Sequence, residues 1–567
     1  MRTAQKSYLC LYHLLFAYYT TLAKGFTTGG TGSVATTFQN AFASVAVDCN
    51  TRPWSSKLEM SDSIGGADIT SSALPNQPGG DNSDDSFSAA AESSAKSDAT
   101  FDWLGEWYPV IPVQDLSTTT PNKITLLGKD FVVWFHEPST SWRAFADVCP
   151  HRLVPLSEGR LEGDVIQCAY HGWSFNEEGA CTRIPQLVAD KQALDSPRSC
   201  ATKFPTRVEQ GLLWLFPTAD ENLASKKSPA LIAELDDPTM VDGTNFFFRD
   251  MEYSWDILVE NLCDPAHVPF AHHSYMRGAD RTKESSLPID IEVTKETVAG
   301  FQAQRVSTPT TTGKYDVSFQ APCLLYYSIS NSVALGEGRP KGENYIGLGQ
   351  YCVPTAPGRC RLIARFPLKI PVPAAMWITR HTPRWITHFS QNIVMDSDVV
   401  FLKSQDEYLD SPAVKERNKP EYYLPAKSDS MVTAFRKWLL KSGGKPKWFG
   451  ETATRSLGEP YGFVRPTNVP AKQGRDVLLD RFRQHTEVCS SCRRAHRTLY
   501  RMKEGLHAAG VVTVALAAAL RASRTLRLAS ALLSICLLSA PRLVLQPIIS
   551  RMEGMPWPRR KWLEGST

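Results

Sequence analysis

Hydrophobic and polar positions divide the chain into a β-patterned part, a helical part and two apolar runs. Residues 124–135 and 212–216 alternate or run apolar, with β-branched and aromatic side chains between turn residues, which predicts short strands. Residues 392–407 carry apolar side chains at helical spacing, which predicts one helix. The apolar runs 508–520 and 526–549 lie near the C-terminus. We therefore predict an α+β body that begins with an all-β domain and is followed by a pair of apolar helices.

The first hundred residues lack the pattern of a folded domain. Residues 1–23 place two basic residues before an apolar run and a small-residue stretch, which is the order of a secretory signal. Residues 26–47 contain no charged residue, and residues 61–100 are rich in Ser, Ala, Asp and Gly with few large apolar side chains. The uncharged stretch suits a transit segment after the signal, so we predict a two-part targeting leader and a disordered segment over residues 1–100. The alternative is a plain signal peptide followed by a disordered tail.

The two C-terminal apolar runs predict a membrane hairpin anchor at residues 505–550, followed by a basic tail at 551–567. Basic residues are more frequent outside the runs than between them. The outer ones are Arg493, Arg494, Arg497, Arg501 and Lys503 before the runs and Arg551, Arg559, Arg560 and Lys561 after them, against Arg521, Arg524 and Arg527 between them. This asymmetry predicts the folded body and the tail on the same face of a membrane. The alternative is a pair of amphipathic helices in the membrane interface or packed on the protein.

Composition narrows the classes of partner. The chain has 567 residues, 42% of them hydrophobic, which is enough for more than one buried core. Its 62 basic and 58 acidic side chains leave a net charge of +4, so no nucleic-acid partner is expected. The 13 cysteines are odd in number and several lie near histidines, which favours metal or redox chemistry over disulfide cross-linking.

Two short motifs predict an iron–sulfur cluster. Cys149-Pro-His151 and Cys168-Ala-Tyr-His171 each supply one thiolate and one imidazole, so together they offer two sulfurs to one iron and two nitrogens to another. This is the Rieske [2Fe–2S] arrangement. Neutral imidazoles in place of two thiolates raise the cluster potential, which suits an acceptor of electrons from a low-potential ferredoxin. A zinc site is the alternative, but zinc sites normally pair like ligands within each arm.

A second metal centre is predicted about a hundred residues later. Asp264, His267 and His272 lie within nine residues, and two imidazoles with one carboxylate form the triad that holds non-haem Fe(II) with positions open for oxygen. Pro265 and Pro269 interrupt the segment, so a regular helix is not expected there. Because a one-electron cluster needs an acceptor, the Rieske motif makes a second iron site the favoured interpretation of this segment.

The combined spacing resembles that of the α-subunits of Rieske non-haem iron oxygenases. The resemblance implies an all-β Rieske domain at residues 101–222, then a helix-grip catalytic domain at 223–480 with an antiparallel sheet and helices. It implies that His267 and His272 bind the mononuclear iron. It also implies that the candidate catalytic residue Asp264 links this iron to the Rieske ligand His171, usually on the neighbouring subunit of a homotrimer. The third iron ligand is expected on the late helix, where Asp398 is our choice and Asp396 is its rival.

Longer stretches resemble the plastid group of this family, which contains pheophorbide a oxygenase, chlorophyllide a oxygenase and Rieske proteins of the import translocon. These stretches are Phe101-Asp-Trp, Trp107-Tyr-Pro-Val, Cys149-Pro-His-Arg-Leu, Cys181-Thr-Arg-Ile-Pro-Gln and Asp264-Pro-Ala-His-Val-Pro-Phe-Ala-His-His. The resemblance implies a ferredoxin-dependent monooxygenase that oxidises a chlorophyll-derived tetrapyrrole with O₂, most like the pheophorbide enzymes. It also implies a thylakoid or inner-envelope membrane, with the catalytic body on the stromal side. The alternatives are a chlorophyllide or protochlorophyllide oxygenase, a non-enzymatic redox component of plastid protein import, and a Rieske electron-transfer protein.

A further cysteine pair, Cys489-Ser-Ser-Cys492, lies in the segment 481–504 just before the apolar runs. Two cysteines at this spacing can close a disulfide, and the arginines that follow favour the thiolate. The resemblance to the plastid group implies a redox switch under thioredoxin control. A metal site is the alternative, because His485, Cys489, Cys492 and His496 could offer four zinc ligands.

Overall fold

The computed structural model describes most of the chain from residue 101 to residue 554. The described ranges are 101–188, 191–273, 275–276, 279–282, 286–306, 315–330, 345–370, 372–409, 422–443, 475–519 and 523–554. The predicted leader, residues 1–100, and most of the predicted basic tail lie outside these ranges, as does residue 521 between the two apolar runs.

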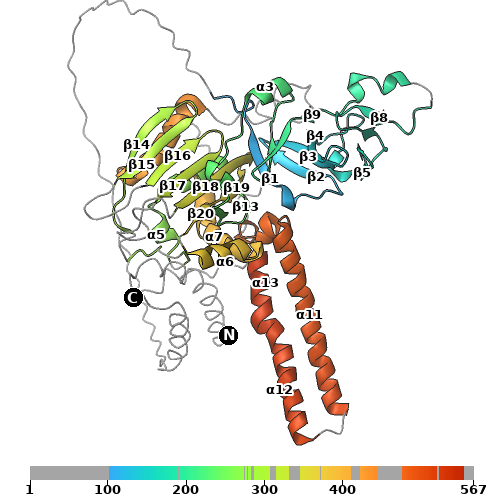
Figure 1. Ribbon diagram of the computed structural model, residues 1–567, viewed down its shortest axis with the longest axis vertical. Helices are drawn as coiled ribbons and strands as arrows, with labels where there is room; N and C mark the ends of the chain where they lie inside the picture. The colour runs from blue at the N-terminus through green and yellow to red at the C-terminus, as the bar shows by residue number, and fades with distance from the viewer. Residues whose placement is uncertain are drawn as a thin grey trace, which may run out of the picture. The chain divides into compact units, whose positions relative to one another are not determined.

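The N-terminal part of the described chain is built from three antiparallel sheets (Figure 1). The first contains β1 (Tyr108–Pro112), β10 (Thr206–Glu209) and β11 (Leu212–Leu215); the second contains β2 (Asn122–Leu126), β3 (Lys129–His136), β4 (Ser141–Ala146) and β9 (Lys203–Phe204); the third contains β5 (Arg160–Glu162), β6 (Val165–Gln167), β7 (Ser174–Phe175) and β8 (Cys181–Arg183). Leu127 and Gly128 join β2 to β3 with φ of 52° and 78°, as a tight hairpin turn requires. The predicted all-β start of the body is confirmed.

A nine-stranded antiparallel sheet forms the centre of the second part. Its main path runs β12 (Val241–Asp242), β20 (Pro367–Lys369), β18 (Tyr345–Ala356), β17 (Leu324–Ser330), β16 (Tyr315–Gln320), β15 (Gly300–Val306) and β14 (Asp290–Thr297), while β13 (Phe247–Met251) pairs with β19 (Arg359–Arg365) beside β18. Alternate residues of β16 are buried, because one face of the sheet is covered by helices. This sheet with its helices is the antiparallel catalytic fold that the sequence resemblance implied.

Three helices supply the main cover of this sheet. They are α4 (Trp255–Cys263), α7 (Arg384–Leu409) and α9 (Ser430–Trp438), and their apolar residues join those of the strands in one core. The other helices of this part and of the segment before it are α3 (Glu221–Lys226), α5 (Val268–Ala271) and α6 (Pro373–His381). The predicted helix at 392–407 is part of α7, which begins eight residues earlier and ends two residues later.

The C-terminal segment is a helical hairpin. It contains α10 (Arg475–Leu478), a π-helical turn (Phe482–Thr486), α11 (Ser490–Ala519), α12 (Arg524–Ala540), a second π-helical turn (Pro541–Leu545) and α13 (Gln546–Glu553). α11 and α12 lie side by side (Figure 1), and a Cβ at Gly510 would come within 2.7 Å of Leu538, so glycine permits the close approach. Among the described residues, the helical stretch from Arg524 to Glu553, which contains α12, the second π-helical turn and α13, is long and apolar enough to cross a membrane, with a mean hydropathy of 1.9 over 18 of its residues. The run on α11 does not meet the same criterion.

Candidate metal centres

The four predicted cluster ligands lie on two loops. Cys149 follows β4. Its backbone N–H donates to Val154 O at 2.8 Å, and Leu153 N–H donates to Cys149 O at 2.9 Å. Cys168 follows β6, and its N–H donates to Trp173 O at 2.8 Å. Each thiol is therefore held inside a closed loop, and both are almost completely buried.

The two imidazoles of these loops lie at the protein surface. The rings of His151 and His171 have centroids 4.6 Å apart, and His151 stacks on Trp173 at 4.7 Å. His151 is exposed and His171 is half-buried. Partial desolvation by neighbouring groups, followed by the charges of His171 and Arg152, lowers the pKa of His151, which favours the neutral imidazole that a metal needs. Two buried thiols and two adjacent imidazoles on these loops fit the donor types of a [2Fe–2S] cluster.

A second set of donors converges between α5 and α7. His267 and His272 flank the short helix α5, one before its first residue and one after its last. Their Nε2 atoms lie 3.7 and 3.4 Å from Oδ2 of Asp398 on α7. The three ligand atoms lie within 4.8 Å of one another, which fits a single metal ion.

Hydrogen bonds fix the orientation of His272. Its Nδ1 lies 2.6 Å from the Ser397 hydroxyl, and that hydroxyl donates its own proton to Val394 O at 2.6 Å. Ser397 must therefore accept from His272 Nδ1–H, which leaves the lone pair on Nε2 facing Asp398. The ring is oriented for metal binding by a side chain of the helix that carries the carboxylate.

Burial and neighbouring charges shift the pKa values of Asp398, His272 and His267. Burial raises the pKa of Asp398 to about 6, and burial together with His267 lowers the pKa of His272 to about 4. For His267, burial acts downward, but Asp264 and Asp398 outweigh it and raise the pKa. The charged forms of Asp398 and His272 are therefore disfavoured, and a bound cation would offset the cost of an ionised Asp398.

The structure separates the two aspartates considered as the third ligand. Asp396 points away from the histidine pair: its Oδ1 lies 2.6 Å from Arg249 Nη1, and Arg481 Nε donates to its Oδ2 at 2.6 Å. All three side chains are buried. Asp396 is thus engaged in an ion-paired cluster, and the carboxylate that lies beside the histidines belongs to Asp398.

Asp264 lies on the outer side of His267. Its Oδ2 is 3.7 Å from His267 Nδ1, and its Oδ1 accepts from Ala266 N–H at 2.8 Å. About a third of its side chain, 31%, remains exposed. Nδ1 of His267 is buried and makes no hydrogen bond with a described residue, so the facing carboxylate of Asp264 is its nearest polar neighbour of opposite charge.

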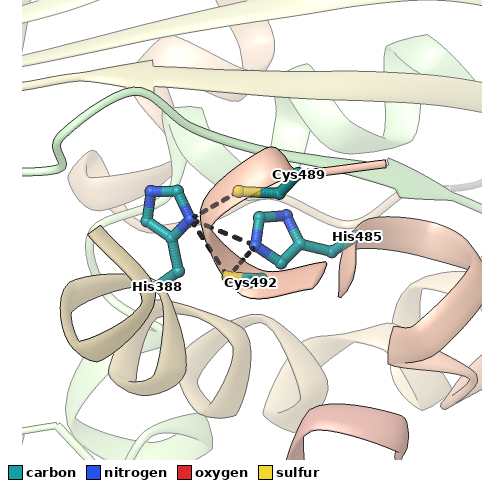
Figure 2. A group of neighbouring side chains, drawn as sticks. All are labelled: His388, His485, Cys489 and Cys492. Atoms are coloured by element: carbon teal, nitrogen blue, oxygen red, sulfur yellow. Dashed lines mark hydrogen bonds between the residues drawn. The ribbon is translucent and has the colours of Figure 1, made fainter. Parts of the chain in front are cut away.

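A third donor group surrounds the cysteine pair (Figure 2). Cys489 and Cys492 are free and buried, and they lie with His485 and His388 rather than with His496. His496 Nε2 instead pairs with Glu553 at 2.9 Å. The four-ligand set considered from the sequence is therefore wrong at its fourth member.

Sequence reasoning missed two residues of these centres. His388 is a single histidine on α7, 97 positions before His485, and no local spacing marks it. Ser397 was visible only as the residue before Asp398.

A cavity of about 480 Å³ lies against α5, where Ala266, Pro269 and Phe270 contribute to its mainly apolar wall.

Comparison with known proteins gives matches over both parts of the chain. The Rieske [2Fe-2S] domain family matches residues 106–203, and the family described as pheophorbide a oxygenase matches residues 319–414. The chloroplastic pheophorbide a oxygenase of Arabidopsis thaliana is 39% identical over 74% of this chain and 77% of its own length. The corresponding protein of Oryza sativa subsp. japonica is 35% identical, covering 76% and 80%. The chloroplastic flavonoid 8-hydroxylase 2 of Ocimum basilicum has the same identity, 35%, and the same coverage.

Proposed function

The chain belongs to the pheophorbide a oxygenase family of Rieske oxygenases, and from this premise we propose that it oxidises a chlorophyll-derived tetrapyrrole with O₂. The observation that carries the proposal is the convergence of His267, His272 and Asp398 in a chain that also holds a Rieske donor set. A protein that only transferred electrons, or only served protein import, would not need the second centre. Reduced ferredoxin is the proposed electron donor, in keeping with the high potential expected of a Rieske cluster.

The residues divide the work between two metal groups. Cys149 and Cys168 would hold one iron of the cluster, and His151 and His171 the other. When bound, the cluster supplies single electrons and the mononuclear iron activates O₂. Asp398, His267 and His272 would hold that iron on one side, since their ligand atoms face a common point. Ser397 keeps the His272 ring in the tautomer that leaves Nε2 free.

Asp264 would connect the two centres between neighbouring subunits. Its carboxylate faces His267 Nδ1 on one side and is 31% exposed on the other, which leaves room for a residue from another chain. His171 is half-buried at the surface of the Rieske part, so its imidazole is accessible to a neighbour. These features support electron transfer from His171 through Asp264 to His267 within a homotrimer.

The hairpin would anchor the enzyme to a membrane. Its outer part exposes large apolar side chains, which include Val511, Val512, Leu516, Leu528, Leu532, Leu533 and Ile535. Residues 508–519 rise by only about 18 Å, less than the roughly 30 Å hydrocarbon core, so insertion into part of the bilayer fits better than two full spans. The relatives are chloroplastic, which supports a plastid location, with the body on the stromal side as the proposed orientation.

Turnover with defined substrates tests the proposal. The purified full chain would be mixed anaerobically with pheophorbide a, chlorophyllide a, protochlorophyllide a or a flavone, then given reduced ferredoxin and ¹⁸O₂. We expect ¹⁸O in a tetrapyrrole product and none in a matched Asp398→Ala sample. Oxidation of the flavone alone would overturn the substrate class, because the flavonoid relative is as similar as the rice protein. No product from any substrate, with an intact reduced cluster, would favour the redox role in protein import.

A further inference from the structure

Four donor atoms meet at the base of the C-terminal hairpin (Figure 2). Nδ1 of His388 lies 3.1 Å from Nε2 of His485. Cys489 Sγ lies 3.5 Å from His388 Nδ1, and Cys492 Sγ lies 3.2 Å from His485 Nε2. A fourth distance, from Cys492 Sγ to His388 Nδ1, is 3.6 Å, and all four donor atoms lie within 4.8 Å of one another. His388, His485 and Cys489 are fully buried and Cys492 is 3% exposed. The group is thus a closed Cys₂His₂ set.

Backbone carbonyls fix the tautomers of both histidines. His388 Nε2 lies 3.0 Å from Asn245 O, and His485 Nδ1 faces Phe248 O at 2.5 Å. A carbonyl oxygen can only accept, so each of these nitrogens carries the proton. The other nitrogens, His388 Nδ1 and His485 Nε2, then direct lone pairs at the two sulfurs and at each other. Metal-binding histidines are commonly held in this way, by a hydrogen bond from the ring N–H that faces away from the metal.

The separations match the edges of one tetrahedron. With Zn–N near 2.0–2.1 Å and Zn–S near 2.3 Å, a tetrahedral site has N···N edges of about 3.4 Å and N···S edges of about 3.6 Å. The observed edges, 3.1 to 3.6 Å, lie within a few tenths of an ångström of these values. A two-iron cluster would hold its sulfur and nitrogen ligands on different irons and so further apart.

We propose that His388, His485, Cys489 and Cys492 bind one Zn²⁺ in a closed structural site. The ligand types and the tetrahedral edges select zinc among common metals. Two thiolates and two neutral imidazoles cancel the charge of a divalent ion, so the buried complex carries no net charge. Binding replaces the two thiol protons by the ion and releases them to solvent. All four positions are taken by protein, which leaves none for a reaction.

The site joins three parts of the protein. His388 lies on α7, the helix that carries Asp398 about 15 Å further along its axis, whereas the other three ligands lie at the start of the hairpin. Asp115 of the Rieske part supports both sides: it accepts from Arg384 Nη2 at 2.7 Å and from Ser490 N–H at 2.8 Å. Zinc would therefore fix the base of the hairpin to the helix that carries the mononuclear-iron carboxylate.

Metal content tests the assignment. The full chain, purified with its cluster and dialysed against a weak chelator, should contain one zinc per chain in addition to its iron. His388→Ala should lose this zinc, while the absorption and electron paramagnetic resonance of the Rieske cluster remain. His496→Ala is the matched control, because this histidine lies one turn beyond Cys492 but bonds to Glu553. It should keep the full zinc content.

Cobalt substitution gives an independent readout. Co²⁺ in the full chain should show the strong visible bands of a tetrahedral ion and a thiolate charge-transfer band in the near ultraviolet. His388→Cys offers a replacement ligand, so it should retain the metal and strengthen the charge-transfer band. This variant keeps the test valid if His388→Ala does not fold.

Four outcomes would overturn the proposal. They are iron in place of zinc at this position, loss of zinc from His496→Ala with retention in His388→Ala, no zinc or cobalt binding, and a Cys489–Cys492 disulfide in the isolated protein. The last would restore the redox pair as the function of these cysteines. Zinc at one per chain, removed by His388→Ala and retained by His388→Cys, would support the site.

Discussion

The chain builds two Cys₂His₂ groups from the same donors in opposite surroundings. In the Rieske part, Cys149 and Cys168 are buried, but His151 is exposed and His171 half-buried. At the hairpin base, all four side chains are buried and each distal imidazole nitrogen faces a carbonyl. An electron-transfer cluster needs an imidazole edge near its partner, whereas a structural ion needs closure. The two groups have the same types of donor, so the exposure of their histidines distinguishes an electron-transfer cluster from a structural metal site.

The groups also differ in how the chain supplies the ligands. The Rieske donors come from two loops that are nearly adjacent in sequence, each with one cysteine and one histidine. At the hairpin base, three donors lie within eight residues and the fourth is 97 positions before His485. The Rieske arrangement supplies two pairs of ligands for two irons, whereas the arrangement at the hairpin base supplies four ligands to one ion. We therefore expect that a variant can lose the Rieske cluster and keep zinc, or lose zinc and keep the cluster.

The largest expected effect is that of Cys168→Ser. Loss of one of the two buried thiolates should abolish the Rieske cluster and with it all turnover, because the cluster depends on two thiolates for one of its irons. Zinc should remain at one per chain. Electron paramagnetic resonance of the reduced protein and metal analysis of the same sample measure both. Simultaneous loss of zinc and cluster would show that the two groups are not independent.

The second-largest effect is expected from Asp398→Ala on α7, the helix that carries both His388 of the hairpin site and Asp398 of the mononuclear centre. Asp398→Ala should remove the mononuclear iron and lower turnover by more than about 100-fold, beyond the usual effect of a residue that only supports a ligand. The Rieske signal and the zinc at His388 should stay, because Asp398 contacts His267 and His272 and lies ten positions along α7 from His388. Iron analysis and turnover on one preparation give the answer. Iron retained in full would remove Asp398 from the ligand set.

Asp396→Asn is the control on the same helix. It leaves Arg249 and Arg481 with an uncompensated buried charge, which costs about 3–5 kcal/mol of folding stability. Thermal unfolding should therefore show a large drop, while iron per folded chain stays unchanged. A stable variant without iron would reverse the two assignments.

The sequence predicts the parts of these centres that lie within short segments. Cys149-x-His and Cys168-x-x-His, and Asp264 with His267 and His272, are recognisable because local spacing carries the chemistry. Their roles stay predictions. Asp396 and Asp398 are two residues apart on one helix, so only the arginines supplied by distant segments show which of them faces away. A lone histidine such as His388 has no local signal, since its partners arrive through tertiary packing.

Asp264→Asn should have an intermediate effect that leaves every metal in place. The amide keeps the size but removes the negative charge beside His267 Nδ1. We expect cluster oxidation after mixing the reduced, substrate-loaded enzyme with O₂ to slow by roughly 10–100-fold, the usual effect of changing a group that contacts a metal ligand. Stopped-flow absorbance measures this step directly. An unchanged rate would remove Asp264 from the electron path, and loss of iron would show a ligand role instead.

The smallest effect is expected from Ser397→Ala. Without the hydroxyl, Nδ1–H of His272 loses its acceptor in a buried site, so the ring is no longer held in the metal-binding tautomer. Iron affinity should weaken about tenfold, the lower end of the range for residues that hydrogen-bond to a metal ligand. Competition with a chelator measures the change. Ser404→Ala is the matched control, because Ser404 Oγ bonds Val400 O at an exposed position on the same helix, and zinc should stay bound in both variants. Equal iron affinity in the two would mean that packing alone orients His272. A tenfold difference would show that the open iron site, like the closed zinc site, depends on an acceptor behind its histidine.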